Sequence, residues 1–198
     1  MTSATQTRLA ELTAYLTTHP SVRSLTLYGS LAEGCDDEYS DIDMALDVSG
    51  TDNGVFLLAL PGILAQKYPV LYTDFAPSLA PDQYILTSAI YPENPFLLLD
   101  ISVTAAPHYT TITKGMLSER NNLYSHTLKL FTANLKHFLR GSDCSRDIRK
   151  MTGRLPGYDE NSSLPDMLRH TYLWLTENAS YEMMEYLSRF LLYIQRLG

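Results

Sequence analysis

One short stretch constrains the fold of this chain more than any other, because it combines two strand-like segments with a glycine–serine turn. Residues 24–28 read Ser-Leu-Thr-Leu-Tyr, and this alternation is typical of a half-buried strand. The segment runs directly into Gly29 and Ser30, and residues 42–48 then alternate in the same way. A glycine at the end of a strand permits a tight turn and a close approach of the backbone to another group. The pattern predicts two strands, the first of which ends in such a turn.

Acidic side chains stand at the beginning of the second strand. Asp41 and Asp43 are two positions apart and therefore project from the same face. Two carboxylates held side by side repel each other unless a cation joins them, and hard divalent metals prefer oxygen ligands. Ser30 adds a hydroxyl donor, and backbone amides at the start of a following helix attract anionic oxygens. We therefore expect a phosphate-binding turn at Gly29 and Ser30 beside a metal site.

These residues resemble the signature of the DNA polymerase beta-like nucleotidyltransferase superfamily, and most nearly its small antibiotic-modifying members, which act on aminoglycosides and lincosamides. The signature is a glycine–serine turn, a short spacer and a pair of aspartates, here Gly29-Ser30-Leu31-Ala32-Glu33-Gly34 and Ser40-Asp41-Ile42-Asp43. The resemblance implies that Gly29 and Ser30 hold a nucleoside triphosphate. It also implies that Asp41 and Asp43 bind magnesium, with two ions in a working site.

Members of this superfamily use a third carboxylate on a neighbouring strand, and two aspartates are candidates. Asp100 lies in residues 96–103, an otherwise apolar strand pattern that follows the turn sequence at 92–95. Asp74 lies near the end of residues 70–75. An ionised carboxylate among apolar neighbours is costly to bury unless a cation or hydrogen bonds compensate it. The hairpin arrangement around Asp100 resembles that of the antibiotic adenylyltransferases, and this resemblance favours Asp100 as a metal ligand and general base; Asp74 remains the alternative.

The resemblance also implies a reaction. A nucleoside monophosphate, AMP in the favoured case, would pass from a nucleoside triphosphate to an acceptor hydroxyl, and pyrophosphate would leave. Some relatives recruit the base from the helical half of the chain instead. That half and its junction offer four glutamates: Glu119, Glu177, Glu182 and Glu185.

The remaining patterns predict an α+β protein in two parts. A mixed-sheet nucleotidyltransferase domain is expected at residues 1–114, and an α-helical bundle on the substrate side at residues 115–198. The expected strands are 24–28, 42–48, 70–75, 84–91 and 96–103. The expected helices are 8–18 and 55–67, then one that includes 128–138, and further helices at 143–152, 164–177 and 180–197.

The charge balance bears on the class of substrate. The chain has 15 lysines and arginines against 22 acidic residues, a net charge of −7. Proteins that grip polynucleotides usually present a basic face. The nearest candidate is the cationic stretch Arg146, Arg149, Lys150 and Arg154, which we interpret as a solvated helix face. The balance favours a small acceptor, cationic in the case of an aminoglycoside, over DNA or RNA.

Other features point to a cytoplasmic protein without a membrane partner. No apolar run approaches the roughly 20 residues that span a bilayer, and the first residues lack the apolar stretch of a signal peptide. Cys35 and Cys144 stand far apart, in no metal-ligand spacing. Many members of the superfamily complete their active-site cleft with a second subunit, so a homodimer is possible. Its interface could come from residues 55–65 or the last helix, which could equally belong to the core.

The leading acceptor is therefore a small molecule such as an aminoglycoside-like or lincosamide-like antibiotic, with ATP as the favoured donor. One alternative is an antitoxin of the minimal-nucleotidyltransferase type that modifies a partner protein, although residues 115–198 argue against it. Another is a catalytically silent nucleotide-binding scaffold, which the intact glycine–serine and aspartate elements disfavour.

Overall fold

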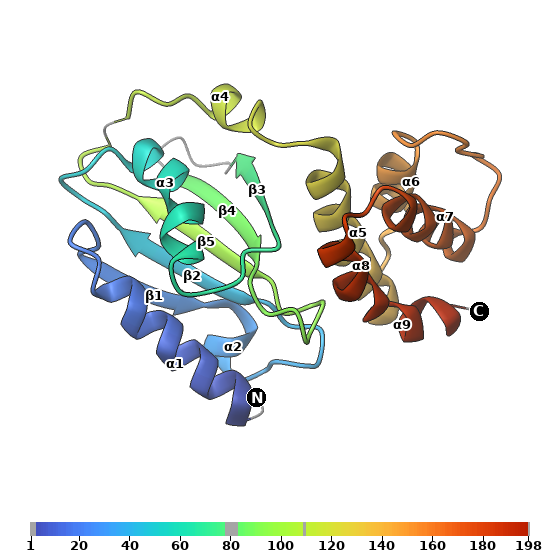
Figure 1. Ribbon diagram of the computed structural model, residues 1–198, viewed down its shortest axis with the longest axis horizontal. Coiled ribbons are helices and arrows are strands. Elements are labelled where there is room, and N and C mark those ends of the chain that lie inside the picture. Colours follow the sequence, from blue (N-terminus) through green and yellow to red (C-terminus); the bar gives the residue numbers. More distant parts are fainter. Residues whose placement is uncertain (1–2, 78–82, 109, 198) are drawn as a thin grey trace. The chain divides into compact units, whose positions relative to one another are not determined.

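The computed structural model describes residues 3–77, 83–108 and 110–197, and the chain forms two compact units (Figure 1). The first comprises Met1–Tyr91 and Leu97–Asn121, and it holds a β-sheet with packed helices. The second comprises Pro92–Phe96 and Asn122–Gly198, and its secondary structure is helical. The expected α+β class is confirmed.

A mixed sheet of five strands organises the first unit. In chain order the strands are β1 (Ser24–Tyr28), β2 (Ile42–Asp47), β3 (Tyr72–Pro77), β4 (Gln83–Ala89) and β5 (Leu99–Thr104). Their order across the sheet is β1-β2-β5-β4-β3. Only β2 and β5 pair in parallel, and the other neighbours are antiparallel. Because β2 and β5 are adjacent and run the same way, both begin at the same edge of the sheet.

The sheet has one apolar and one polar face. Along β2, Ile42, Met44 and Leu46 are fully buried, whereas Asp43 and the residues in step with it are half-buried. The apolar face packs against α1 (Ser3–Thr17) and α3 (Asn53–Ala65), which lie on the same side of the sheet (Figure 1). Burial of a leucine side chain contributes about 2 kcal/mol, so the leucines of these helices supply much of the stability. The opposite face carries the polar side chains.

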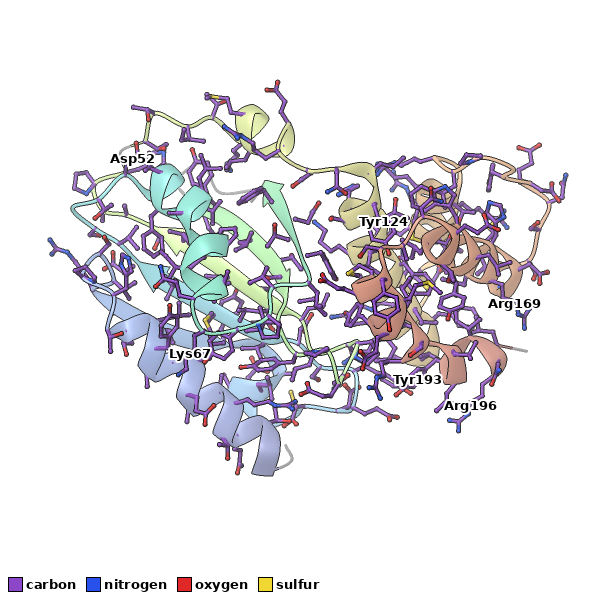
Figure 2. All side chains as sticks on the ribbon, viewed as in Figure 1. Asp52, Lys67, Tyr124, Arg169, Tyr193 and Arg196 are labelled. Atoms are coloured by element: carbon purple, nitrogen blue, oxygen red, sulfur yellow. The ribbon has the colours of Figure 1, made fainter. Side chains whose placement is uncertain are left out.

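The start of α3 is tied to a distant loop through Asp52 (Figure 2). Its Oδ1 accepts hydrogen bonds from the backbone nitrogens of Gly54 and Val55, both at 3.0 Å. Its Oδ2 accepts one from the backbone nitrogen of Thr111 at 2.8 Å. This cap starts the helix at residue 53 rather than at residue 55, where the apolar pattern alone would begin it.

The sheet unit extends to Asn121 and the helical unit resumes at Asn122, whereas the domain division expected from the sequence lies at residues 114 and 115. The short helix α4 (Lys114–Ser118) packs against β3, which is an edge strand. The side chain of Asn121 pairs with that edge: its Oδ1 accepts from the Phe75 nitrogen and its Nδ2 donates to the Phe75 oxygen, both at 2.7 Å. The amide thus forms the two hydrogen bonds that an additional strand would form with this edge, and it holds residues 115–121 to the sheet unit.

The second unit contains α5 (Leu123–Leu139), α6 (Ser145–Thr152), α7 (Leu164–Glu177), α8 (Tyr181–Ser188) and α9 (Leu191–Gln195). The single helix expected at 180–197 is thus divided in two. At the division the nitrogens of Arg189 and Phe190 bond to carbonyls three residues earlier, which tightens the turn and ends the regular helix. Among the described residues, no helix is both long and apolar enough to cross a membrane.

The segment Pro92–Phe96 connects β4 to β5 in sequence but packs within the helical unit. The hydroxyl of Tyr186 donates to the Pro95 oxygen at 2.8 Å. The ring of Phe96 is fully buried and meets Phe190 and Tyr193 edge to face, with centroids 5.5 and 4.9 Å away. The helical core therefore takes one of its aromatic side chains from the connection between two strands.

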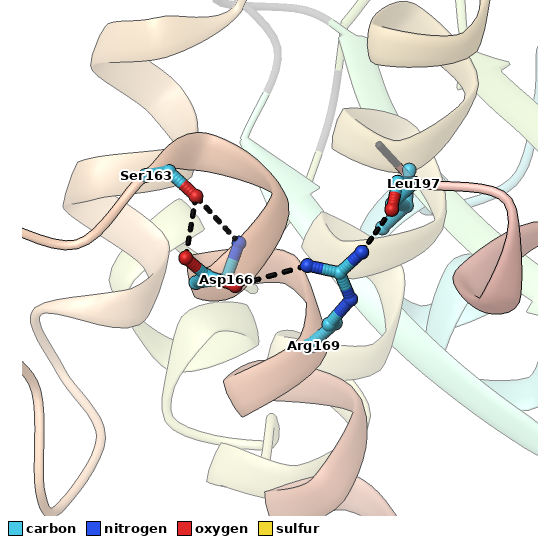
Figure 3. Close-up of polar contacts among 4 residues, drawn as sticks. All are labelled: Ser163, Asp166, Arg169 and Leu197. Carbon is cyan, nitrogen blue, oxygen red and sulfur yellow. Dashed lines mark hydrogen bonds and ion pairs between the residues drawn. The ribbon is translucent and has the colours of Figure 1, made fainter.

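A cap and an ion pair organise the first turn of α7 (Figure 3). The hydroxyl of Ser163 accepts from the Asp166 nitrogen at 3.2 Å and donates to its Oδ2 at 2.6 Å. Asp166 also pairs with Arg169 at 2.9 Å, and the guanidinium of Arg169 donates to the carbonyl of Leu197. The last described residues are thereby fastened to the beginning of α7.

Candidate active site

A row of five residues crosses the polar face of the sheet, one from each strand. Tyr28 on β1 is opposite Asp43 on β2, and Asp43 is opposite Asp100 on β5. Asp100 is in turn opposite Thr87 on β4, and Thr87 is opposite Asp74 on β3. Directly opposed residues of paired strands share a face, and their side chains are neighbours. The register therefore places the carboxylates of Asp43 and Asp100 side by side.

Exposure to solvent increases along this row. Asp74 is fully buried and Thr87 is 4% exposed, whereas Asp43 and Asp100 are half-buried and Tyr28 is 40% exposed. The row is thus closed at β3 and open at β1. A ligand could reach the two central carboxylates, which is a requirement for any binding role that they have.

Thr87 orients Asp100. The threonine hydroxyl donates a hydrogen bond to Oδ1 of Asp100 at 2.5 Å. Because Thr87 is buried and its side chain has a stiff first torsion, the bond holds the carboxylate in one orientation. The sequence patterns did not single out Thr87, since only the pairing of β4 with β5 brings it to Asp100.

Tyr28 lies close to all three carboxylates of the predicted site. Burial raises the pKa of its phenol, and the negative charges of Asp43, Asp100 and Asp41 raise it further. The phenol therefore stays protonated at neutral pH and can donate a hydrogen bond. Sequence reasoning also missed Tyr28, although its position directly before Gly29 at the end of a strand was a usable signal.

The Asp43 carboxylate leaves no room for a side chain at position 29, so this position requires a glycine. The φ of Gly29 is +71°, in the left-handed region that favours glycine, and a Cβ at this position would collide with Oδ2 of Asp43. The glycine therefore lets the turn and Asp43 pack together, where the sequence suggested only an approach to phosphate. Ser30 follows in the short helix α2 (Gly29–Glu33) and is half-buried.

The loop that precedes β2 is held by its own hydrogen bonds. Oδ1 of Asp37 accepts from the Ser40 hydroxyl at 2.9 Å and from the Tyr39 nitrogen at 3.0 Å. The Ser40 hydroxyl in turn accepts from the Asp37 nitrogen at 3.0 Å. These bonds fix the chain directly before Asp41, which explains the place of Ser40 in the motif.

Asp74, the alternative third carboxylate, stands apart from this pair. It lies two strands beyond Asp100, so strand spacing alone separates the two by roughly 10 Å. The register therefore brings Asp100, and not Asp74, next to Asp43.

Of the four glutamates considered as a base, Glu119 is at the end of α4, and the other three are on α7 and α8 in the helical unit: Glu177, Glu182 and Glu185.

The carboxylates fit magnesium by their chemistry. Within the described part of the chain, no three histidine, cysteine or acidic side chains are already grouped closely enough to hold a metal ion. Magnesium, however, takes one or two carboxylates, keeps several waters and completes its shell with phosphate oxygens of the substrate. Asp43 and Asp100 supply two adjacent oxygen donors of this kind, and Asp41 lies near the same phenol.

Comparisons with known proteins assign the chain to no family. No family model matches the sequence, and no curated protein matches it. Several solved structures are similar, and one of them is titled "structure of GLD-2/RNP-8 complex". It shares 15% identity with this chain, at a TM-score of 0.41, and the match covers 91% of this chain and 81% of that one.

Proposed function

We propose that this protein is a magnesium-dependent nucleotidyltransferase, which transfers a nucleoside monophosphate from a nucleoside triphosphate to a hydroxyl group. One observation carries the proposal: Asp43 and Asp100 are register neighbours on parallel strands, and Asp43 packs against the Gly29 turn. Adjacent carboxylates beside a backbone turn are what a metal–triphosphate site requires.

In this proposal Asp41, Asp43 and Asp100 hold magnesium, and Gly29 and Ser30 receive the triphosphate. Bound magnesium would neutralise the charge of the triphosphate and of the leaving pyrophosphate. Asp100 has the additional role of general base. Since Thr87 engages its Oδ1, the carboxylate presents a fixed orientation to the acceptor hydroxyl.

The reaction is a substitution at the α-phosphorus. The acceptor hydroxyl gives its proton to Asp100, and its oxygen forms a bond to the α-phosphorus. The bond from that phosphorus to the oxygen bridging the α- and β-phosphates breaks. Pyrophosphate leaves with the electron pair of that bond, so atoms and charge balance.

The acceptor in this proposal is a small molecule, with aminoglycoside-like or lincosamide-like antibiotics as the first class to test. The net charge of −7 and the accessible carboxylates of Asp43 and Asp100 support a cationic aminoglycoside in particular. ATP is the favoured donor.

A catalytically silent nucleotide-binding scaffold is the alternative outcome. A scaffold would bind nucleotide without turnover, whereas a transferase would release pyrophosphate.

Calorimetric titration of ATP, GTP, CTP and UTP with magnesium tests the proposal, followed by a pyrophosphate-release assay over a panel of antibiotics. Asp43→Asn should lose magnesium-dependent binding and reduce transfer by roughly 100-fold or more, because a metal contact is worth several kcal/mol. Asp47→Asn is the matched control: it removes the same charge from the same face of β2, and Asn keeps the acceptor for Ser49. Equal behaviour of the two variants would reject the site. Binding without release of pyrophosphate would favour the scaffold.

A further inference from the structure

A pocket of about 370 Å³ lies within the helical unit, between α5 and α6. Helix α5 contributes residues at helical spacing from His126 to His137, and α6 contributes Asp147 and Lys150, with Arg154 directly after it. The pocket uses none of the residues of the candidate active site. Its size is that of a site for a small ligand, because such pockets measure roughly 300–1,000 Å³.

The wall of this pocket is rich in hydrogen-bond donors. Lys150 and Arg154 are the cationic side chains of the lining, and Asp147 is its one acidic residue. The guanidinium Nη1 of Arg154 lies 3.0 Å from Nε2 of His126, which must accept this hydrogen bond because arginine is always a donor. These cations gather in a chain whose net charge is −7. The wall is therefore complementary to an anion.

The floor of the pocket combines apolar groups with one buried amide. Leu130, Ala133 and Met151 supply apolar surface. Asn134 is 5% exposed, and its Nδ2 donates to the sulfur of Met151 at 3.6 Å. A thioether is a weak acceptor, so an anionic oxygen in the pocket would make a stronger partner for this amide. A buried polar group that lines a cavity is the second feature that points to a ligand.

Two other occupants fit less well. Two histidines and an aspartate suggest a metal, but no such group in the described residues is close enough together to hold one. A polynucleotide needs an extended basic stripe, whereas this surface is a small concavity with an apolar floor. A compact anion with an apolar body matches both the wall and the floor.

We propose that this pocket binds a small organic phosphate. The phosphate would lie against Lys150, Arg154 and the amide of Asn134, and the apolar body would lie against Leu130 and Met151. Guanidinium and ammonium groups are the usual partners of phosphate, the first through paired hydrogen bonds and the second as a point charge. Within the cationic stretch of Arg146, Arg149, Lys150 and Arg154, the ligand would then contact Lys150 and Arg154, which line the pocket.

The probe is phenyl phosphate, titrated calorimetrically into the full chain at pH 7 with EDTA present, so that no magnesium–nucleotide site contributes. We expect a dissociation constant on the order of 1 mM or tighter. Lys150→Gln should weaken binding about tenfold or more, because it removes a charge-assisted contact. Arg146→Gln is the matched control, since Arg146 is an exposed cation of the same helix that does not line the pocket. It should change affinity less than about twofold.

Several outcomes would overturn the proposal. If Lys150→Gln and Arg146→Gln lose affinity to the same degree, the phosphate is attracted by diffuse positive charge and binds as an adventitious ion only. Failure of the wild-type chain to bind phenyl phosphate would show that the pocket does not bind small organic phosphates. Tighter binding of a single-stranded RNA decamer, also weakened by Arg146→Gln, would mark a polynucleotide surface instead. Asp43→Asn must bind phenyl phosphate normally, which keeps this test separate from that of the transferase.

Discussion

At the scale of single residues, Gly29 and Gly34 have the same backbone conformation but different surroundings. Both have φ of +71°. A Cβ on Gly29 would collide with Asp43, whereas a Cβ on Gly34 would meet no atom within 4 Å. Substitutions at these two glycines, which lie at the ends of α2, therefore distinguish the destabilisation caused by backbone strain from that caused by displacing a carboxylate.

Alanine at each glycine tests this distinction. Gly34→Ala should lower the free energy of unfolding by about 1 kcal/mol and leave magnesium–nucleotide binding intact, because only strain is added. Gly29→Ala should cost more stability and also abolish that binding, because the Asp43 carboxylate must move. Urea unfolding and calorimetry measure the two effects. Normal nucleotide binding by Gly29→Ala would contradict the role of Asp43.

Thr87 provides a second test at this scale. Thr87→Val keeps the shape of the side chain but removes the hydrogen bond to Asp100, so the turnover rate should fall roughly tenfold while KM for the nucleotide stays unchanged. Thr87→Ser retains a hydroxyl and should restore most of the rate. If valine and serine behave alike in steady-state kinetics, the hydroxyl does not position the base.

At the scale of elements, α3 depends on an aspartate that caps it and binds a loop. Burial alone would raise the pKa of Asp52, but hydrogen bonds from Thr110, Val55 and Thr111 outweigh it and lower the pKa to about 2. The folded state therefore favours the ionised form. Because the folded pKa lies below the ordinary value of 3.8, this contribution to stability is present above about pH 4 and is lost as the pH falls toward 2.

Asp52→Ala should therefore lower the free energy of unfolding by about 1–2 kcal/mol at pH 7, as expected for loss of a helix cap. The difference from wild type should shrink as the pH falls below 4. Asp52→Asn keeps the acceptor for Gly54 and Val55 but loses the one for Thr111, so its stability should be intermediate. Urea titrations at several pH values measure this. A difference that does not change with pH would exclude the carboxylate charge as its source.

The element scale also shows what the sequence could predict. Local alternation was enough for the strands and the polar face, and periodicity was enough for most helices. Pairing across strands is not encoded locally, so Thr87 and Tyr28 were missed, and only the register shows that Asp100, the favoured candidate, lies opposite Asp43 whereas Asp74 does not. The boundary at 121 was equally hidden, because it depends on one side-chain amide that reaches an edge strand.

At the scale of the whole molecule, the chain passes between the two units three times, at residues 91–92, 96–97 and 121–122. The helical unit is therefore discontinuous in sequence. Phe96 and Pro95, which precede β5, contribute to its core through Phe190 and Tyr186. The stability of the helices thus depends in part on Phe96, which the strand pattern at 96–103 assigns to the sheet.

Phe96→Ala should destabilise the helical unit by about 3–5 kcal/mol, the usual cost of deleting a buried aromatic ring. Trp174 is the only tryptophan and lies on α7, so its fluorescence reports on that unit during urea unfolding. Phe56→Ala is the comparison, because Phe56 is buried on α3 in the sheet unit. An unchanged Trp174 midpoint in Phe96→Ala would mean that Phe96 does not support the helices.

The course of the chain through Pro92–Phe96 limits how this protein can be recombined. A graft that joins residues 122–198 to another sheet domain would leave Phe96 behind, together with the carbonyl that receives the Tyr186 hydroxyl. A hydrophobic gap would open in the transplanted helices, and the donor sheet would carry an aromatic ring with nowhere to pack. A working chimera must therefore exchange two stretches of sequence together, residues 92–96 and residues 122–198.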